Sequence, residues 1–277
     1  MRADLHVHST ASDGQYAPAE LVRLAGERSI QVLALTDHDS LDGLEEALDA
    51  GKALGLPVLR GVELGAREYR NLHILGYGFS AAAPGLRELC AQMRRGRDQR
   101  KFRIVDYLRD KGVPVTLEEV EEIAGGNIIG RPHFAQAMVR RGYAASIQEA
   151  FERYLDTADY ARIERPKPSA RACVEAIRAA GGRAALAHPY QVGLEDGALE
   201  SLVKELAGYG LEALECFYPR HTEAQTAFFL RLAEKYRLQV TGGSDFHGEA
   251  VKPDIRLTAW DLDPAWLLET QRENDKA

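Results

Sequence analysis

The chain has 277 residues, of which 45% are hydrophobic and 28% charged, a balance typical of a globular protein with a sizeable core. Its formal net charge of −7 argues against a general electrostatic grip on nucleic acid, duplex DNA included, because neutralising phosphates requires a basic face. The three cysteines form no CxxC pair, and no segment approaches the roughly 18 apolar residues of a membrane span, so we expect a soluble cytoplasmic protein without a disulfide framework.

The first 82 residues alternate short apolar runs with amphipathic segments. Apolar positions three and four apart predict helices, and short apolar runs between turn residues predict strands. The elements expected in this part are strands at Ala3–Val7, Val32–Leu35, Val58–Val62 and Leu72–Tyr77 and helices at Pro18–Arg28 and Leu41–Leu54.

The middle of the chain, residues 83–168, has only helical patterns. These helices are expected at Leu86–Lys111, Leu117–Ile123, Pro132–Arg141 and Ile147–Leu155. An all-helical block within an alternating pattern is typical of an inserted subdomain. Because inserts and loops on a rigid scaffold often carry function, we expect this one to form a lid over the substrate.

The alternation returns after residue 168. Helices are expected at Ala170–Ala180, Leu199–Tyr209 and Glu223–Tyr236, and strands at Arg183–Ala187, Ala213–Phe217 and Val240–Gly243. Repeated strand–helix units imply parallel strands with right-handed crossovers, and about seven such units favour a closed barrel over an open sheet. We therefore predict an α/β barrel made of residues 1–82 and 169–270, with the helical insert at 83–168.

Histidines mark the ends of the predicted strands. In a parallel barrel the C-terminal strand ends converge on one face, where active sites lie. His6 and His8 are two residues apart on a strand, so both rings point to one side and can reach one ion. The histidines at or near strand ends are His6, His8, His38, His73, His188 and His247.

Carboxylates accompany these histidines. Glu63 ends an apolar strand, where a carboxylate without a partner would be costly, and Asp245 and His247 repeat the spacing of the first histidine pair. Each such residue alone is more often a helix cap, a turn residue or a core histidine. Together they supply about nine nitrogen and oxygen donors without cysteine, which suits Mn²⁺, Fe²⁺ or Zn²⁺. Nine donors exceed the needs of one ion, so two or three ions are expected.

Five segments, in order along the chain, resemble the PHP (polymerase and histidinol phosphatase) superfamily. They are Asp4-Leu5-His6-Val7-His8-Ser9, Thr36-Asp37-His38-Asp39, Gly61-Val62-Glu63, His188-Pro189 and Gly243-Ser244-Asp245-Phe246-His247. The resemblance implies a distorted (β/α)7 barrel with a trinuclear metal centre, Mn²⁺ being the first choice of metal.

The resemblance also implies a ligand set for each ion. The first ion would be held by His6, His8, Glu63 and Asp245. Glu63 would bridge to a second ion that is also held by His73 and His188, and the third would be held by Asp13, His38 and His247. No catalytic group is expected beyond a hydroxide held and activated by the ions.

Two further segments point to the substrate. Ser12-Asp13-Gly14 and Arg131-Pro132-His133-Phe134 resemble the subgroup of bacterial 3′,5′-nucleotide bisphosphatases and the related 5′→3′ exoribonuclease acting on short RNA. The resemblance implies conversion of a 3′,5′-nucleoside bisphosphate to the 5′-monophosphate, with short single-stranded 5′-phosphorylated RNA as a further substrate. Arg131 and His133 stand where a helix begins, which suits a phosphate.

Other residues near the predicted site are weaker candidates. Arg220 and His221 follow the strand Ala213–Phe217 and form a second candidate phosphate clamp. Tyr218 and Phe246 are candidates to stack on a base, although aromatic residues at a barrel rim are as often packing residues.

Three alternatives remain open at this point. The substrate could be histidinol phosphate or another small phosphomonoester. Amidohydrolases, which cleave C–N bonds, also open with HxH on a barrel strand, but Glu63 stands where they use a lysine bridge. A PHP module without catalytic activity is the third alternative; it predicts broken ligand positions, whereas all nine are present.

Overall fold

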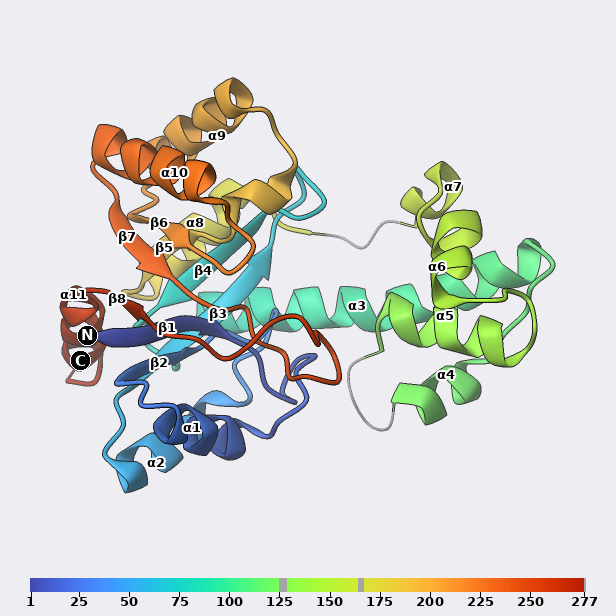
Figure 1. Cartoon of the computed structure of the whole chain (residues 1–277), viewed down its shortest axis with the longest axis horizontal. Helices are drawn as coiled ribbons and strands as arrows, with labels where there is room; N and C mark the ends of the chain where they lie inside the picture. Colours follow the sequence, from blue (N-terminus) through green and yellow to red (C-terminus); the bar gives the residue numbers. More distant parts are fainter. Residues whose placement is uncertain (125–128, 164–166, 277) are drawn as a thin grey trace. The chain divides into compact units, whose positions relative to one another are not determined.

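The computed structural model describes residues 1–124, 129–163 and 167–276. The chain divides into two compact units, one formed by Met1–Ala91 with Lys167–Ala277 and the other by Gln92–Pro166. The first unit is built around a sheet, and the described residues of the second are helical (Figure 1). None of the helices in the described ranges combines the length and apolar character that crossing a bilayer requires.

One mixed sheet, in the order β7-β6-β5-β4-β3-β2-β1-β8, forms the centre of the first unit. Its strands are β1 (Arg2–Val7), β2 (Val32–Leu35), β3 (Val58–Gly65), β4 (His73–Tyr77), β5 (Arg183–Leu186), β6 (Ala213–Phe217), β7 (Gln239–Gly242) and β8 (Trp260–Asp261). The segment after β7 returns to β1: the backbone N–H of Asp245 donates to the carbonyl of His6 at 2.7 Å, and that of His8 to the carbonyl of Phe246 at 2.9 Å. The sheet therefore curls into a nearly closed barrel, and the expected fold is confirmed.

Strand β4 departs from the expected parallel arrangement. It runs antiparallel to both β3 and β5, so the prediction of parallel strands was wrong here. The physical reason is the connection after β3, which is too short for a crossover helix and permits only a hairpin-like return. Because of this reversal His73 pairs with Gly65 at the end of β3. The histidine thus reaches the same end of the barrel as the others from the start of its strand.

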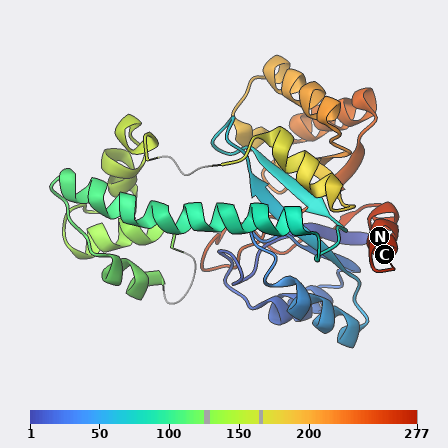
Figure 2. The ribbon, with the colours of Figure 1, turned by 180° about the vertical axis from the view of Figure 1, so that it is seen from behind.

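Helices surround the sheet, and their apolar faces pack on it. They are α1 (Pro18–Glu27), α2 (Leu44–Leu54), α8 (Ala170–Ala179), α9 (Asp196–Tyr209), α10 (Glu223–Tyr236) and α11 (Ala265–Asn274), with a 3₁₀ turn η2 (Pro189–Val192). Helix α8 is typical: Ser169 caps its N-terminus by accepting from the backbone of Ala172, and Cys173 and Ile177 are buried on one face. It lies against β4 and β5 (Figure 2), where a Cβ on Gly76 would come within 2.8 Å of Ile177.

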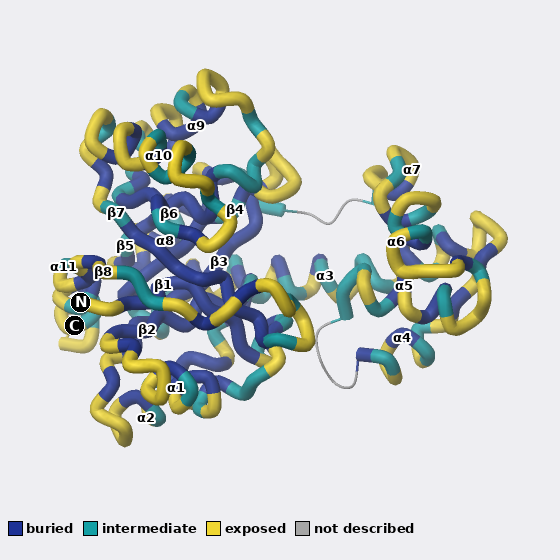
Figure 3. The backbone as a smooth tube through the Cα atoms, viewed as in Figure 1, coloured by how far each residue is buried: buried dark blue, intermediate teal, exposed yellow. Residues whose placement is uncertain are grey.

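The barrel core combines small and large apolar side chains. The strands are almost entirely buried, whereas the outer faces of the helices are exposed (Figure 3). Ala34 and Ala185 are fully buried beside Leu59 and Leu75. The hydroxyl of Tyr77 donates to the carbonyl of Leu5 at 2.9 Å, so the ring can be buried without leaving this group unpaired.

The second unit has its own small core. Its elements are α4 (Leu117–Ala124), α5 (Arg131–Arg140), α6 (Ile147–Ala150), a π-helical turn η1 (Phe151–Leu155) and α7 (Ala158–Ala161), together with the later part of α3 (Pro84–Asp110). Leu108, Phe134 and Leu155 are among its buried side chains. The expected single helix at Ile147–Leu155 is in fact α6 followed by the π-turn. As a compact unit it covers Gln92–Pro166, and the first residues of α3 belong to the barrel unit. The bounds 83–168 of the insert stay a prediction.

Candidate metal centre

The nine predicted ligand side chains lie together at one end of the barrel. They form overlapping groups rather than separate sites. Donor atoms within 4.8 Å of one another occur in the groups His6, His8, Glu63 and Asp245; His8, Asp13, His38 and His247; and His38, Glu63 and His73. His188 joins them through a 2.9 Å contact between its Nε2 and Glu63 Oε1.

Glu63, the one acidic residue of β3, is at the centre of this cluster and is completely buried. Its Oε2 lies 3.3 Å from Nε2 of His6, 3.2 Å from Nε2 of His8 and 2.9 Å from Nδ1 of His38. Its Oε1 lies 2.6 Å from Nδ1 of His73. Each oxygen therefore faces its own group of imidazoles, which is the arrangement that a bridging carboxylate requires.

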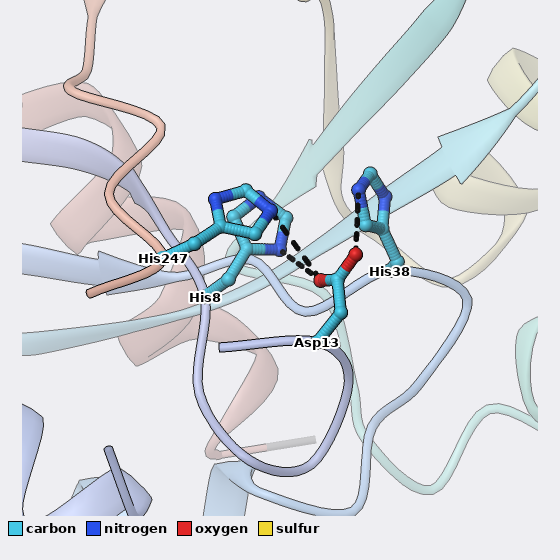
Figure 4. Close-up of side chains that lie close together, drawn as sticks. All are labelled: His8, Asp13, His38 and His247. Carbon is cyan, nitrogen blue, oxygen red and sulfur yellow. Dashed lines mark ion pairs between the residues drawn. The ribbon is translucent and has the colours of Figure 1, made fainter. Parts of the chain in front are cut away.

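Asp13 brings together a second set of imidazoles (Figure 4). Its carboxylate lies 3.8 Å from Nδ1 of His8, 3.9 Å from Nε2 of His38 and 3.3 Å from Nε2 of His247. The loop that carries it needs Gly14, because a Cβ there would lie 2.3 Å from the carbonyl oxygen of His8. The sequence Ser12-Asp13-Gly14 thus allows the loop to fold back onto β1.

The donor atoms of the cluster include several that have no hydrogen-bond partner. Among the described residues, buried polar atoms without a partner include Nε2 of His6, both ring nitrogens of His8, Oε2 of Glu63 and Nδ1 of His188. Leaving such atoms unpaired is costly, typically ~1–3 kcal/mol each. Nitrogen and oxygen donors without a thiolate suit Mn²⁺, Fe²⁺ or Zn²⁺, so the residues present fit a multinuclear metal centre.

The protonation states of the cluster favour cation binding. Burial would raise the pKa of Glu63, but His38, His73 and His6 hold it well below its ordinary value. Burial lowers the pKa of His8 and of His73 to about 4, so both rings are neutral near pH 7. Ionised carboxylates beside neutral imidazoles are the forms that coordinate metal ions.

His6 differs from the other two rings. Burial by itself would lower the pKa of His6, but the carboxylates of Glu215 and Glu63 raise it well above its ordinary value. A metal ion would therefore compete with a proton for the nitrogen of His6 that faces Glu63.

The loops that present the ligands have strained backbones. His188 and Asp245 have positive φ angles of 23° and 56°, which non-glycine residues rarely adopt. Strain of this kind clusters at functional sites, where the surrounding structure holds it in place. At Gly243 a Cβ would lie 2.2 Å from Cβ of His6, so this glycine lets the loop after β7 approach β1.

Sequence analysis gave no role to the buried carboxylates that support the cluster. Asp4 accepts from the backbone N–H of Ser244 at 2.8 Å, and burial raises its pKa to about 7. Asp37 accepts from the backbone N–H of Ser9 at 2.8 Å and from the hydroxyl of Ser12, and burial raises its pKa to about 6. Both residues lie within the recognised segments, and an acidic residue beside an apolar strand was the signal that could have found them.

Asp245 illustrates how such supporting contacts work. Its Oδ1 faces the cluster, 3.3 Å from Nε2 of His8. Its Oδ2 accepts from the hydroxyl of Tyr218 at 3.1 Å and from the ammonium of Lys252 at 2.8 Å. Lys252 was not predicted, since a lysine in a polar loop gives no sequence signal.

The predicted substrate residues fall in both units. His221 lies beside Tyr218, with ring centroids 5.2 Å apart, and its Nδ1 is 3.0 Å from the carbonyl of Cys216. Arg220 pairs with Asp254 at 2.6 Å. Phe246 is only 1% exposed and stacks on Tyr16, so the suggestion that it flanks a base was wrong.

Arg131 and His133 begin α5 in the second unit. The guanidinium of Arg131 pairs with Asp156 at 2.7 Å, and Nδ1 of His133 accepts from the backbone N–H of Gly130 at 3.0 Å, which caps the helix. The structure therefore places the nine predicted ligands and His221 in the first unit. The role of Arg131 and His133 toward substrate stays a prediction.

Comparison with known proteins identifies the family. Residues 4–164 match the PHP domain. The chain belongs to the PHP domain family. It is 34% identical over 245 residues to a 5′-3′ exoribonuclease of Haemophilus influenzae, covering 88% of this chain and 89% of that protein.

Three further similarities extend along most of the PHP chain. It is 34% identical to a phosphoribosyl 1,2-cyclic phosphate 1,2-diphosphodiesterase of Eggerthella lenta (90% of this chain, 95% of that one). It is 31% identical to a 3′,5′-nucleoside bisphosphate phosphatase of Chromobacterium violaceum (88% and 86%). A solved amidohydrolase structure from Chromobacterium violaceum with bound sulfate matches with a TM-score of 0.82 at 29% identity (100% and 96%). The PHP family match and the phosphate-ester hydrolases among these relatives show that the chain is a hydrolase of the metal-dependent phosphoesterase class, and the expectation of an enzyme is confirmed.

Proposed function

We propose that the chain removes phosphate from nucleotides, converting a 3′,5′-nucleoside bisphosphate to the nucleoside 5′-monophosphate. The observation that carries this proposal is the convergence of nine nitrogen and oxygen donors on one end of the barrel, with several buried donor atoms left unpaired in the described chain. The similarity to the bisphosphate phosphatase of Chromobacterium violaceum supports the choice of substrate.

The proposed cofactor is Mn²⁺, with Fe²⁺ or Zn²⁺ as alternatives, at two or three ions per chain. The ligands would be His6, His8, Glu63 and Asp245 for the first ion, Glu63, His73 and His188 for the second, and Asp13, His38 and His247 for the third. Bound there, the ions would lower the pKa of water and neutralise charge on the phosphoryl oxygens. Because Glu63 is completely buried, bulk water does not reach the carboxylate that the first and second ions would share.

An aromatic wall beside the cluster supports a nucleotide rather than a smaller leaving group. The ring of Tyr218 lies 5.8 Å from that of His188, and Tyr190 lies 5.9 Å from Tyr218. His221 closes the group, 5.5 Å from Tyr190. Stacking of a base on an aromatic ring typically contributes ~1–3 kcal/mol. Tyr190 and His221 are half-buried, whereas Tyr218 and His188 are buried, so the first two rings are the ones that can provide it.

Arg131 and His133 are proposed to bind phosphate from the helical unit, which would then serve as a lid. The pair between Arg131 and Asp156 is partly exposed, at 29% and 43%. Exposed pairs of this kind are weak, so a doubly charged phosphate can replace Asp156 as the partner of the guanidinium. The N-terminus of α5 adds its backbone N–H groups and the positive end of the helix dipole.

Two further substrates belong to the proposal. Short single-stranded 5′-phosphorylated RNA, cleaved from its 5′ end, is supported by the similarity to the exoribonuclease of Haemophilus influenzae. A small cyclic phosphodiester is the second candidate, supported by the similarity to the Eggerthella lenta enzyme. A cytoplasmic location is proposed as well, since the buried Cys173 and Cys216 stand outside any disulfide.

Hydrolysis of a defined set of esters tests the proposal. Protein loaded with Mn²⁺ is given 3′-phosphoadenosine 5′-phosphate, AMP, histidinol phosphate, a phosphoribosyl 1,2-cyclic phosphate and a 5′-phosphorylated RNA oligomer. We expect the highest kcat/KM for the bisphosphate. Hydrolysis confined to histidinol phosphate or to the cyclic ester would reject the nucleotide assignment.

Replacing Arg131 with Ala tests the lid. This variant should raise KM for the bisphosphate about tenfold or more without changing metal content, because a charge-assisted hydrogen bond is worth ~1.5–3 kcal/mol. The matched control is Arg141→Ala, which removes another arginine of the helical unit that pairs with a carboxylate, Glu119. An unchanged KM in Arg131→Ala, or equal increases in both variants, would remove Arg131 from the site.

A further inference from the structure

Glu215 is a buried carboxylate on β6 to which sequence analysis gave no role. Its side chain is fully buried, and each of its oxygens contacts a different predicted ligand residue. Oε1 lies 3.0 Å from Nδ1 of His6, and Oε2 accepts a 2.6 Å hydrogen bond from the backbone N–H of His188. Glu215 therefore links the end of β1 to the segment that follows β5.

The contact with His6 determines which ring nitrogen carries a proton. An ionised carboxylate can only accept, so Nδ1 of His6 donates its N–H to Glu215. In the neutral ring the lone pair is then on Nε2, which lies 3.3 Å from Oε2 of Glu63 and faces the cluster. Metal-binding histidines commonly donate their other N–H to a carboxylate, which fixes both the tautomer and the ring orientation.

The contact with His188 acts on the backbone instead. His188 has φ 23° and ψ 63°, a conformation that a non-glycine residue keeps only when its surroundings hold it. Its N–H is bound by Glu215, and its Nε2 lies 2.9 Å from Oε1 of Glu63. Glu215 thus holds the turn that aims this ring at the bridging carboxylate.

We propose that Glu215 is a positioning residue that holds one ligand of each of two neighbouring metal ions. His6 faces one oxygen of Glu63 and His188 faces the other, so a single buried carboxylate sets the separation of the two ligands across the bridge. This inference rests on the proposed metal centre. It concerns how the centre is assembled and not which substrate it takes.

Glu215→Gln is the direct test, because it keeps the shape of the side chain and replaces one carboxylate oxygen with an NH₂ group. The backbone N–H of His188 can only donate, so the amide oxygen is expected to stay on it. The amide NH₂ then faces Nδ1 of His6, which must become the acceptor, and the ring proton moves to Nε2, the atom that faces the ions. We expect about 10- to 100-fold weaker metal binding and fewer ions per chain after dialysis against a weak chelator, measured by elemental analysis.

Glu212→Gln is the matched control. Glu212 directly precedes β6, and its carboxylate pairs with Arg183 and Arg178 rather than with a predicted ligand. The same change of glutamate to glutamine at this position should therefore keep wild-type metal affinity. Equal metal loss in the two variants, or undiminished metal affinity in Glu215→Gln, would overturn the positioning role.

The tautomer of His6 provides a second measurement, which does not require Glu215→Gln to fold. In ¹⁵N-labelled wild-type protein loaded with Zn²⁺, the His6 signals are those missing from a His6→Gln spectrum, and they should show the proton on Nδ1. A proton on Nε2 would overturn the proposal. Failure to hydrolyse any ester would reject the proposed function alone, because neither metal affinity nor the tautomer involves substrate.

Discussion

The barrel end and the helical unit carry their charged groups in contrasting ways. At the barrel end, carboxylates and imidazoles are buried, and several donor atoms in the described chain lack a partner. In the helical unit, the charged groups of pairs such as Lys101–Glu121 and Arg141–Glu119 are partly exposed and contact each other. Buried charges without partners are costly unless a ligand completes them, whereas exposed pairs contribute little either way. The difference therefore predicts that metal binding is confined to the barrel end, where the polar groups remain incomplete.

The largest effect is expected from Glu63→Gln, which alters the centre of the incomplete cluster. The amide cannot accept on both sides, so neighbouring ions lose their shared ligand. We expect kcat to fall by at least about 1000-fold, equivalent to ~4 kcal/mol, with reduced metal content. Steady-state kinetics and elemental analysis measure both. Near wild-type kcat with full metal content would contradict the central role of Glu63.

Metal removal should change the stability of the barrel unit but not that of the helical unit. A ligand that binds only the folded state stabilises it by ~2.7 kcal/mol when present at 100 times its Kd. Chelation should therefore lower the free energy of unfolding of the barrel unit and increase hydrogen exchange around β1, β3 and the loop after β7. Exchange within α4 and α5 should stay unchanged. An equal increase in hydrogen exchange in both units would contradict the expected difference between them.

The stability of the metal-free protein should depend on pH because of a buried carboxylate at the barrel end. The pKa of Asp37 in the folded state is about 6, above its ordinary value of 3.8, because the group is buried. The favourable contribution of Asp37 to the free energy of unfolding is fully present below pH 3.8 and is lost as pH rises through 6. Relative to wild type, Asp37→Asn should therefore gain stability between pH 4 and pH 8, by on the order of 2–3 kcal/mol.

Urea unfolding with a chelator present, at several pH values, measures this difference. Groups common to both proteins cancel in the comparison, so only the titration of Asp37 contributes. A difference that stays constant from pH 4 to pH 8 would show that Asp37 ionises normally.

The smallest effect is expected in the helical unit. Glu121→Gln removes the partner of Lys101, a pair with an N–O distance of 3.2 Å whose side chains are 49% and 24% exposed. The free energy of unfolding should change by less than about 0.5 kcal/mol, with no change in metal content. Thermal unfolding measures it. A loss of stability comparable to that caused by chelation would mean that charged groups also stabilise the helical unit substantially.

Much of the site could be predicted because it follows local periodicity. His6 and His8 share a side of β1 since strand residues alternate, and Asp245 with His247 repeats the spacing after β7. The barrel's convergent strand ends then bring together residues that are far apart in the sequence. The alternation of strands and helices also predicted the barrel, and most element boundaries agree to within a few residues.

What the tertiary structure alone decided depends on contacts that no spacing encodes. Glu215 and His6 are 209 residues apart, and an acidic residue on a core strand gives no hint of which ring it will orient. Strand β4 likewise pairs with β5, with Ile74 beside Leu186, and no spacing in the sequence encodes that distant partner. The sequence by itself determined which side chains can bind metal, because donor chemistry and local periodicity are properties of the residues. Only the fold decided which atoms face the centre and which hold it in place, because those roles depend on burial and on partners distant along the chain.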